Sequence, residues 1–133
     1  MTVSVTLIYA ILLSLLYIVL SARVGSTRVR RKITIGDGGN ADLLRRIRVH
    51  GNFSEYTPIC LILIYLLEVS AFSPTVIHIL GITLFVGRLV HAWGFGSTPE
   101  NMAGRSIGMV LTFAVIVGAG LLTIARLGFG LML

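Results

Sequence analysis

The stretch VSVTLIYAILLSLLYIVLSA, residues 3–22, contains twenty residues and no charged side chain. A helix of about 20 apolar residues is long enough to cross the roughly 30 Å hydrocarbon core of a bilayer. A second uncharged stretch of the same length, SIGMVLTFAVIVGAGLLTIA, covers residues 106–125. Together with 56% hydrophobic residues and a mean hydropathy of +0.96, these stretches predict a membrane protein and exclude an ordinary soluble domain.

The length of 133 residues leaves room for one transmembrane domain of four helices. We predict an all-α, integral membrane four-helix bundle over residues 1–133, with spans at about 3–23, 43–68, 74–96 and 104–126. The first hydrophobic stretch is too long for the core of a typical signal peptide, so we interpret it as a retained helix. The first and last spans carry charge only at their ends, whereas the second and third carry charged residues within them.

Basic residues gather in and beside the predicted connection at residues 23–42. They are Arg23, Arg28, Arg30, Arg31, Lys32, Arg45 and Arg46. Cytoplasmic loops of membrane proteins carry such an excess of arginine and lysine, which also contacts anionic lipids. We therefore expect this connection in the cytoplasm and both termini on the non-cytoplasmic side, with only Arg126 opposing the rule. This distribution favours membrane lipids over nucleic acid as partners.

Short motifs predict where the connections turn. The GDGG segment at residues 36–39 suits a turn that needs positive φ angles. We expect Ser73 to cap the third helix with Pro74 in its first turn. Ser97 and Glu100 have capping-box spacing, which predicts that they start the fourth helix.

Glycines are frequent in the fourth predicted span. Gly104 and Gly108 form a GxxxG pair, and Gly118 and Gly120 follow further along the helix. Small residues at this spacing allow membrane helices to approach closely, so we expect tight packing of this span against a neighbour.

The stretch RVHGNFSEYTP places polar residues inside the second predicted span. At helical spacing the side chains on or beside one stripe are Arg45, Arg48, Asn52, Glu55 and Tyr56. A charge deep in the bilayer costs at least about 2.5–3.5 kcal/mol, so such residues normally face a bundle interior or a wet cavity. The stripe therefore predicts a polar pocket rather than a lipid-facing surface.

The third and fourth spans contribute to the same membrane level. Arg88, His91 and Phe95 form a second stripe, and Arg105 and Ser106 follow at the start of the fourth span, while His50 lies beside the first stripe. One interpretation is structural: Arg48 or Arg88 pairs with Glu55 and locks the helices together. The other is that the excess of arginines over carboxylates binds an anionic ligand.

These residues resemble the family of membrane-associated proteins in eicosanoid and glutathione metabolism. The RxxxNxxExxP signature of its second helix is present as Arg48, Asn52, Glu55 and Pro58, and the third span contains GRLVHAWGF at residues 87–95. The resemblance covers virtually the whole chain and is closest to the small bacterial branch of the family. Apart from the family, Pro58 removes a backbone donor and predicts a kink just past Glu55.

The resemblance implies a homotrimer that binds glutathione between neighbouring subunits and lies in the bacterial inner membrane. The residues implied in glutathione binding are Arg28, Arg45, Arg48, His50, Asn52, Glu55, Tyr56, Arg88 and His91. Arginine can grip a carboxylate with two hydrogen bonds, and Glu55 can accept the ammonium group of the tripeptide. No metal site is expected.

Arg105 and Ser106 are the residues implied in catalysis. A free thiol has a pKa of about 8.5, and only the thiolate is nucleophilic. A guanidinium at a helix N-terminus favours the thiolate through its own charge and through the helix dipole. Phe95 departs from the tyrosine usual in eicosanoid-synthesising relatives, so one hydroxyl contact is lost.

Three functions compete. The first is a glutathione transferase or peroxidase that acts on hydrophobic electrophiles from the bilayer. The second is a non-catalytic lipid- or glutathione-binding scaffold, against which Arg48 and Arg105 argue. The third is a small proton-coupled multidrug exporter, which predicts an isolated carboxylate, whereas Glu55 has arginines near it in the sequence.

Overall fold

A computed structural model describes residues 4–129, and within this range the chain forms four α-helices and no strand. The helices are α1 (Val5–Arg31), α2 (Ala41–Val69), α3 (Pro74–Gly96) and α4 (Met102–Phe129). All four are long and apolar enough to cross a membrane. The predicted all-α fold of four membrane-spanning helices is therefore confirmed for the described residues, whereas residue 3 of the first predicted span lies outside them.

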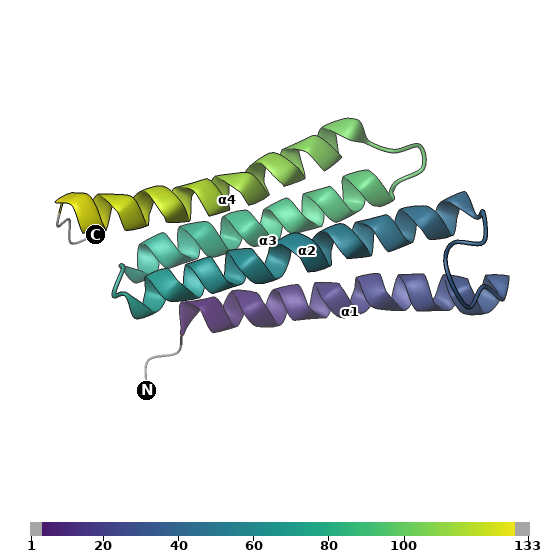
Figure 1. Cartoon of the computed structure of the whole chain (residues 1–133), viewed down its shortest axis with the longest axis horizontal. Helices are drawn as coiled ribbons and strands as arrows, with labels where there is room; N and C mark the ends of the chain where they lie inside the picture. The colour runs from purple at the N-terminus through teal and green to yellow at the C-terminus, as the bar shows by residue number, and fades with distance from the viewer. Residues whose placement is uncertain (1–3, 130–133) are drawn as a thin grey trace.

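The four helices run antiparallel to their neighbours in sequence, so the molecule has two distinct ends (Figure 1). We call the end with the connections at residues 32–40 and 97–101 the basic end. The opposite end, with both chain termini and the turn at residues 70–73, is the terminal end. The predicted charge asymmetry therefore follows the long axis of the bundle.

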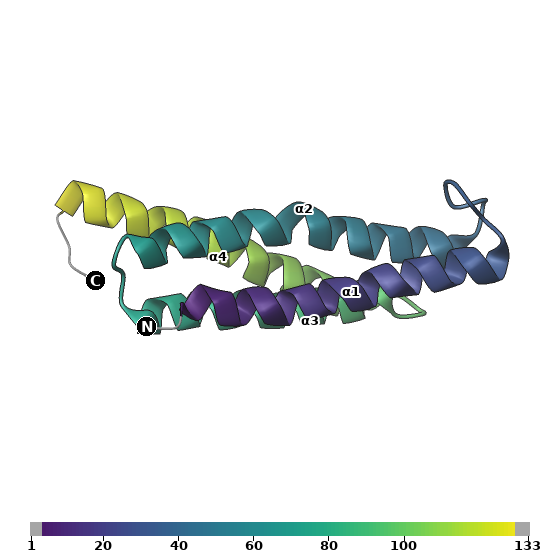
Figure 2. The same cartoon turned by 90° about the horizontal axis from the view of Figure 1, so that it is seen from below.

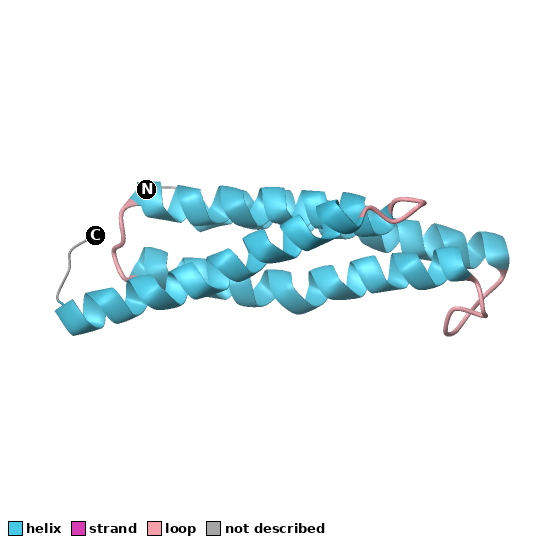
Figure 3. Ribbon diagram, turned by 90° about the horizontal axis from the view of Figure 1, so that it is seen from above, coloured by secondary structure: helices cyan, strands magenta, loops and turns pink. Residues whose placement is uncertain are grey.

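Helices α2 and α3 form the centre of the bundle, and α1 and α4 flank them without contacting each other over the described range. Helix α4 starts beside α3 at the basic end and crosses towards α2 at the terminal end (Figures 2 and 3). The basic half of α4 therefore packs mainly on α3, whereas its terminal half also approaches α2.

The end of the first helix differs from the prediction. We expected a connection from residue 23, but α1 continues to Arg31 and ends with Lys32 in the left-handed conformation. Arginines are good helix formers and favour a helix C-terminus, so no local signal stops the helix earlier. Thr27 is buried, which indicates that these added turns still pack on the bundle.

The turn predictions are partly confirmed. Gly36, Gly38 and Gly39 have positive φ angles, as the GDGG segment predicts. Ser73 and Pro74 hold the expected positions at the start of α3, although the Ser73 side chain makes no capping hydrogen bond. Helix α2 continues through Pro58, so this proline does not end it.

The predicted capping box of the fourth helix is wrong. Helix α4 begins at Met102, and Oδ1 of Asn101 accepts a hydrogen bond of 2.9 Å from the amide of Gly104. The hydroxyl of Ser97 instead donates to the carbonyl of Gly94. Asn101 is a strong capping residue in its own right, so the cap lies four residues later than the pattern predicts.

Glycines bring α3 and α4 into close contact, as predicted for Gly104 and Gly108. A Cβ atom on Gly94 would lie 2.3 Å from the amide nitrogen of Arg105, and one on Gly108 would lie 2.4 Å from Cβ of His91. By contrast, a Cβ on Gly120 meets no described atom within 4 Å. The glycines of the basic half of α4 thus fix its approach to α3.

Candidate functional site

The centre of the polar region is a buried arginine. Arg88 is 1% exposed, and its Nη1 donates to Oδ1 of Asn52 at 2.9 Å. Its Nη2 lies 3.6 Å from the sulfur of Met109, and its Nε has no hydrogen-bond partner within residues 4–129. Arg88 therefore joins α2, α3 and α4 through neutral groups, and the alternative in which it pairs with Glu55 is wrong for the described residues.

Arg105 lies in the first turn of α4 with an acidic and an aromatic neighbour. Its Nη1 donates to Oε1 of Glu100 at 2.7 Å, and its Cζ lies 4.1 Å from the ring centre of Phe95. The Phe95 ring also meets the buried His91 edge to face, with centroids 5.7 Å apart. The aromatic ring thus connects α3 to the guanidinium that the sequence implicates in catalysis.

Arg48, Glu55 and Ser106 are exposed in the single chain. Neither Arg48 nor Glu55 takes part in an ion pair within the described range, so the alternative pairing of Arg48 with Glu55 is also wrong. The two charges are seven residues apart on one helix, which separates their backbone positions by about 10 Å. The polar stripe therefore divides into a half-buried part at Asn52, which bonds Arg88, and an exposed part at Arg48 and Glu55.

Tyr56 lies on the α4 side of α2. Its ring meets Phe113 edge to face, with centroids 5.6 Å apart. Tyr56 therefore extends the polar region towards α4, and the apolar ring of Phe113 marks the boundary of this region.

Three predicted residues contact other parts of the chain. Arg45 donates from Nη1 to the carbonyl of Ser97 at 2.8 Å, which ties α2 to the connection between α3 and α4. His50 faces α1, where its Nε2 is 2.9 Å from the Ser21 hydroxyl. Arg28 donates to the carbonyl of Gly36. Because α1 and α4 flank opposite sides of the bundle, His50 and Arg28 do not join Arg105 in one chain.

Glu100 is the main residue that the sequence reasoning missed. We assigned it to a capping box, but it supplies the carboxylate beside Arg105. Its distance of five residues from Arg105 spans a turn and a helix start, and no standard helical spacing predicts such a pair. Glu55 likewise forms no ion pair with an arginine among residues 4–129.

Comparisons with known proteins identify the family of this chain. The sequence pattern of the MAPEG family matches residues 6–125. Inner membrane protein YecN of Escherichia coli K12 is 40% identical over 91 residues, which cover 68% of this chain and 70% of YecN. Protein sll1147 of Synechocystis sp. is 33% identical over 110 residues, covering 81% of this chain and 80% of that protein. With four helices able to span a membrane and a match over nearly its whole length, the chain belongs to the MAPEG family of membrane proteins.

Proposed function

We propose that this protein is a glutathione-dependent transferase or peroxidase that acts on hydrophobic electrophiles in the membrane. The family includes glutathione transferases and peroxidases. In this proposal the protein assembles as a homotrimer, binds glutathione between subunits and keeps its basic end in the cytoplasm. The predicted glutathione-binding residues and the catalytic pair of Arg105 and Ser106 keep their proposed roles.

The observation that carries the proposal is the state of Arg105. Nη1 of its guanidinium donates to Glu100. Among residues 4–129, Nη2 and Nε of Arg105 have no hydrogen-bond acceptor. The Phe95 ring holds the guanidinium from one side by a cation–π contact. Arg105 is therefore oriented and partly exposed, with donors left for a thiolate.

The free guanidinium donors of Arg105 are suited to stabilise a thiolate. Lowering a thiol pKa by two units requires about 2.7 kcal/mol of preferential stabilisation of the anion. One charge-assisted hydrogen bond in a partly desolvated site contributes about 1.5–3 kcal/mol, and the N-terminus of α4 adds its positive dipole end. The exposed Ser106 hydroxyl lies next along the helix and is proposed as a second donor.

The exposed charges of α2 support a site between subunits. Arg48 and Glu55 lie on the outer surface of a membrane helix, where an uncompensated charge costs at least about 2.5–3.5 kcal/mol. A tripeptide with carboxylates and an ammonium group, held against a neighbouring subunit, would cover both charges. His50 and Arg28, which face the α1 side, would then reach the glutathione of an adjacent subunit.

The test begins with glutathione titration of the purified wild-type protein, followed by conjugation to a chlorodinitrobenzene-type electrophile. We expect Arg105→Ala to lower turnover about a hundredfold with little change in glutathione affinity, because about 2.7 kcal/mol of thiolate stabilisation is lost. Arg48→Ala should weaken binding instead. Arg46→Ala is the matched control, since Arg46 pairs with Asp42 on the helix surface.

Absence of both glutathione binding and thiolate absorbance in the wild type would refute the enzyme assignment. Unchanged affinity in Arg48→Ala would remove this residue from the binding site. The trimer is tested separately by the mass of the assembly in native mass spectrometry.

A non-catalytic scaffold is the second candidate, because Nη1 of Arg105 already donates a hydrogen bond to Glu100. This candidate predicts that the wild-type protein binds its ligand but does not conjugate glutathione. Arg105→Ala would then not change the background rate of the assay. The exporter is disfavoured by membership of the MAPEG family rather than by arginine contacts of Glu55.

A further inference from the structure

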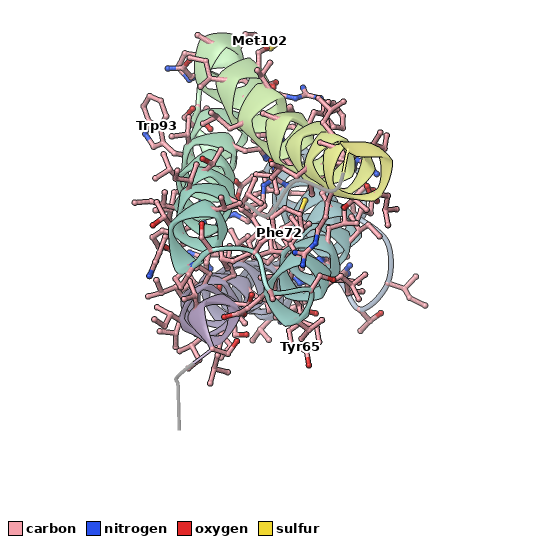
Figure 4. The ribbon with its side chains drawn as sticks, turned by 90° about the vertical axis from the view of Figure 1, so that its left-hand side faces the viewer. Tyr65, Phe72, Trp93 and Met102 are labelled. Carbon is pink, nitrogen blue, oxygen red and sulfur yellow. The ribbon has the colours of Figure 1, made fainter. Side chains whose placement is uncertain are left out.

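A groove at the terminal end lies far from the proposed glutathione site. It runs between α2 and α4, has a volume of about 450 Å³, and is lined by Leu63, Leu66, Leu67, Phe72, Arg126 and Leu127, among others. Figure 4 views this end of the bundle and shows Phe72 between the helices. The volume falls within the range of about 300–1,000 Å³ typical of ligand pockets, and the lining is mainly apolar.

Arg126 gives this apolar groove a positive charge. Its Cζ lies 4.8 Å from the ring centre of Phe72, which is 5% exposed. Its Nη1 is buried and has no hydrogen-bond partner in the described part of the chain. A cation that merely extends to water at a helix end would not bury a donor, so Arg126 has a hydrogen-bonding capacity that residues 4–129 do not use.

The one acidic side chain near the terminal end among residues 4–129 is already engaged. Glu68 accepts hydrogen bonds from the Ser4 hydroxyl and from the amides of Val5 and Thr6, at the start of α1. Glu68 therefore satisfies the N-terminus of α1 and makes no ion pair with Arg126. The counter-ion of Arg126 has to come from outside the described chain.

The depth of Arg126 identifies the kind of anion. Arg105 and Arg126 are 21 residues apart on α4, which corresponds to about 31 Å along the helix axis. This length matches the roughly 30 Å hydrocarbon core, so two arginines at its ends are level with the two layers of lipid headgroups. The group that a bilayer offers at this depth is a phospholipid phosphate.

We propose that the groove is a binding site for an anionic phospholipid. One acyl chain lies along the leucines of α2 and α4, and the headgroup phosphate accepts hydrogen bonds from the Arg126 guanidinium. A lipid with net negative charge is preferred over a zwitterionic one, because nothing else in the described chain neutralises Arg126. The site is independent of the proposed glutathione chemistry at the basic end.

Photolabelling locates the lipid directly. The full-length protein is placed in nanodiscs that contain phosphatidylglycerol with a diazirine in one acyl chain, and labelled peptides are mapped by mass spectrometry. We expect labels on the segments around Leu63 and Leu66 that unlabelled phosphatidylglycerol competes away better than phosphatidylcholine. Labels at the basic end serve as an internal reference, since its arginines attract any anionic lipid.

Matched variants test the charge and the groove separately. Arg126→Gln should lower groove labelling relative to the basic end about fivefold, and Arg126→Lys should keep most of it. Leu66→Trp, at a 52% exposed position, should block the groove, whereas Arg46→Gln should leave groove labelling intact. Thermal unfolding and native mass spectrometry of each variant verify the fold and the assembly.

Two results would overturn the proposal. The first is groove labelling that is equal for both lipids or unchanged in Arg126→Gln. The second is a groove that neither lipid labels, combined with a changed oligomeric mass in Leu66→Trp, because a second copy of the chain would then fill the groove.

Discussion

Arg105 and Arg126 lie at opposite ends of α4, and each places its guanidinium over a phenylalanine ring, at 4.1 and 4.8 Å respectively. Their surroundings differ in one respect. Arg105 has the carboxylate of Glu100 within hydrogen-bond distance, whereas the acid near Arg126 is engaged by the start of α1. The same pair of residue types is therefore joined by a carboxylate at one end and by no carboxylate of residues 4–129 at the other.

The two ends are also held together by different forces. At the basic end, glycines let the backbones of α3 and α4 touch, which fixes Arg105 against Phe95. At the terminal end, α4 crosses towards α2, and a leucine-lined groove lies between these two helices. Rigid positioning suits a catalytic arginine, and an open groove suits a ligand that enters from the bilayer.

The largest effect is expected from filling the contact between α3 and α4. Gly94→Ala would place a Cβ 2.3 Å from the backbone of Arg105, so the helices have to separate. We expect a loss of about 3 kcal/mol in the free energy of unfolding, measured by thermal or denaturant unfolding in detergent. Gly120→Ala is the control, and it should be neutral or stabilising by about 0.5–1 kcal/mol. Equal stability of both variants would contradict this packing.

A smaller effect is expected from Glu68 at the terminal end. Glu68→Gln removes the charge and one of the acceptors that hold Ser4, Val5 and Thr6. The expected loss is about 2 kcal/mol, because these are hydrogen bonds to a charged group. Asp42→Asn, which disrupts an exposed pair with Arg46, should cost no more than about 0.5 kcal/mol in the same unfolding assay. A Glu68 variant as stable as the Asp42 variant would show that this cap contributes nothing.

The smallest effect on stability is expected from Glu100→Gln, which makes Arg105 resemble Arg126. The pair is partly exposed, so the free energy of unfolding should change by less than about 1 kcal/mol. The freed guanidinium should raise the thiolate fraction of bound glutathione about two- to fivefold, measured by thiolate absorbance, with little change in affinity, since a competing carboxylate is gone. A lower thiolate fraction would mean that Glu100 holds Arg105 in its working geometry, and the comparison between the two arginines would fail.

The polar region was predicted only in part from the sequence. Helical spacing indicated that Asn52, Arg88 and Arg105 belong to one region, and the contacts of Asn52 with Arg88 and of Phe95 with Arg105 agree. The same spacing did not reveal that Glu55 points outwards or that Glu100 faces Arg105. Helix rotation and the path of a turn decide those contacts, and both depend on packing against other helices.

The sequence by itself determined the class of the fold and the asymmetry of the charges. Twenty consecutive uncharged, mainly apolar residues indicate a membrane-spanning helix, because a helix satisfies its own backbone hydrogen bonds in hydrocarbon and needs about this length to cross it. The tertiary structure alone decided which charges are neutralised within the chain. An ion pair forms only where two side chains meet in space, and that depends on how glycines, caps and crossing helices bring distant residues together.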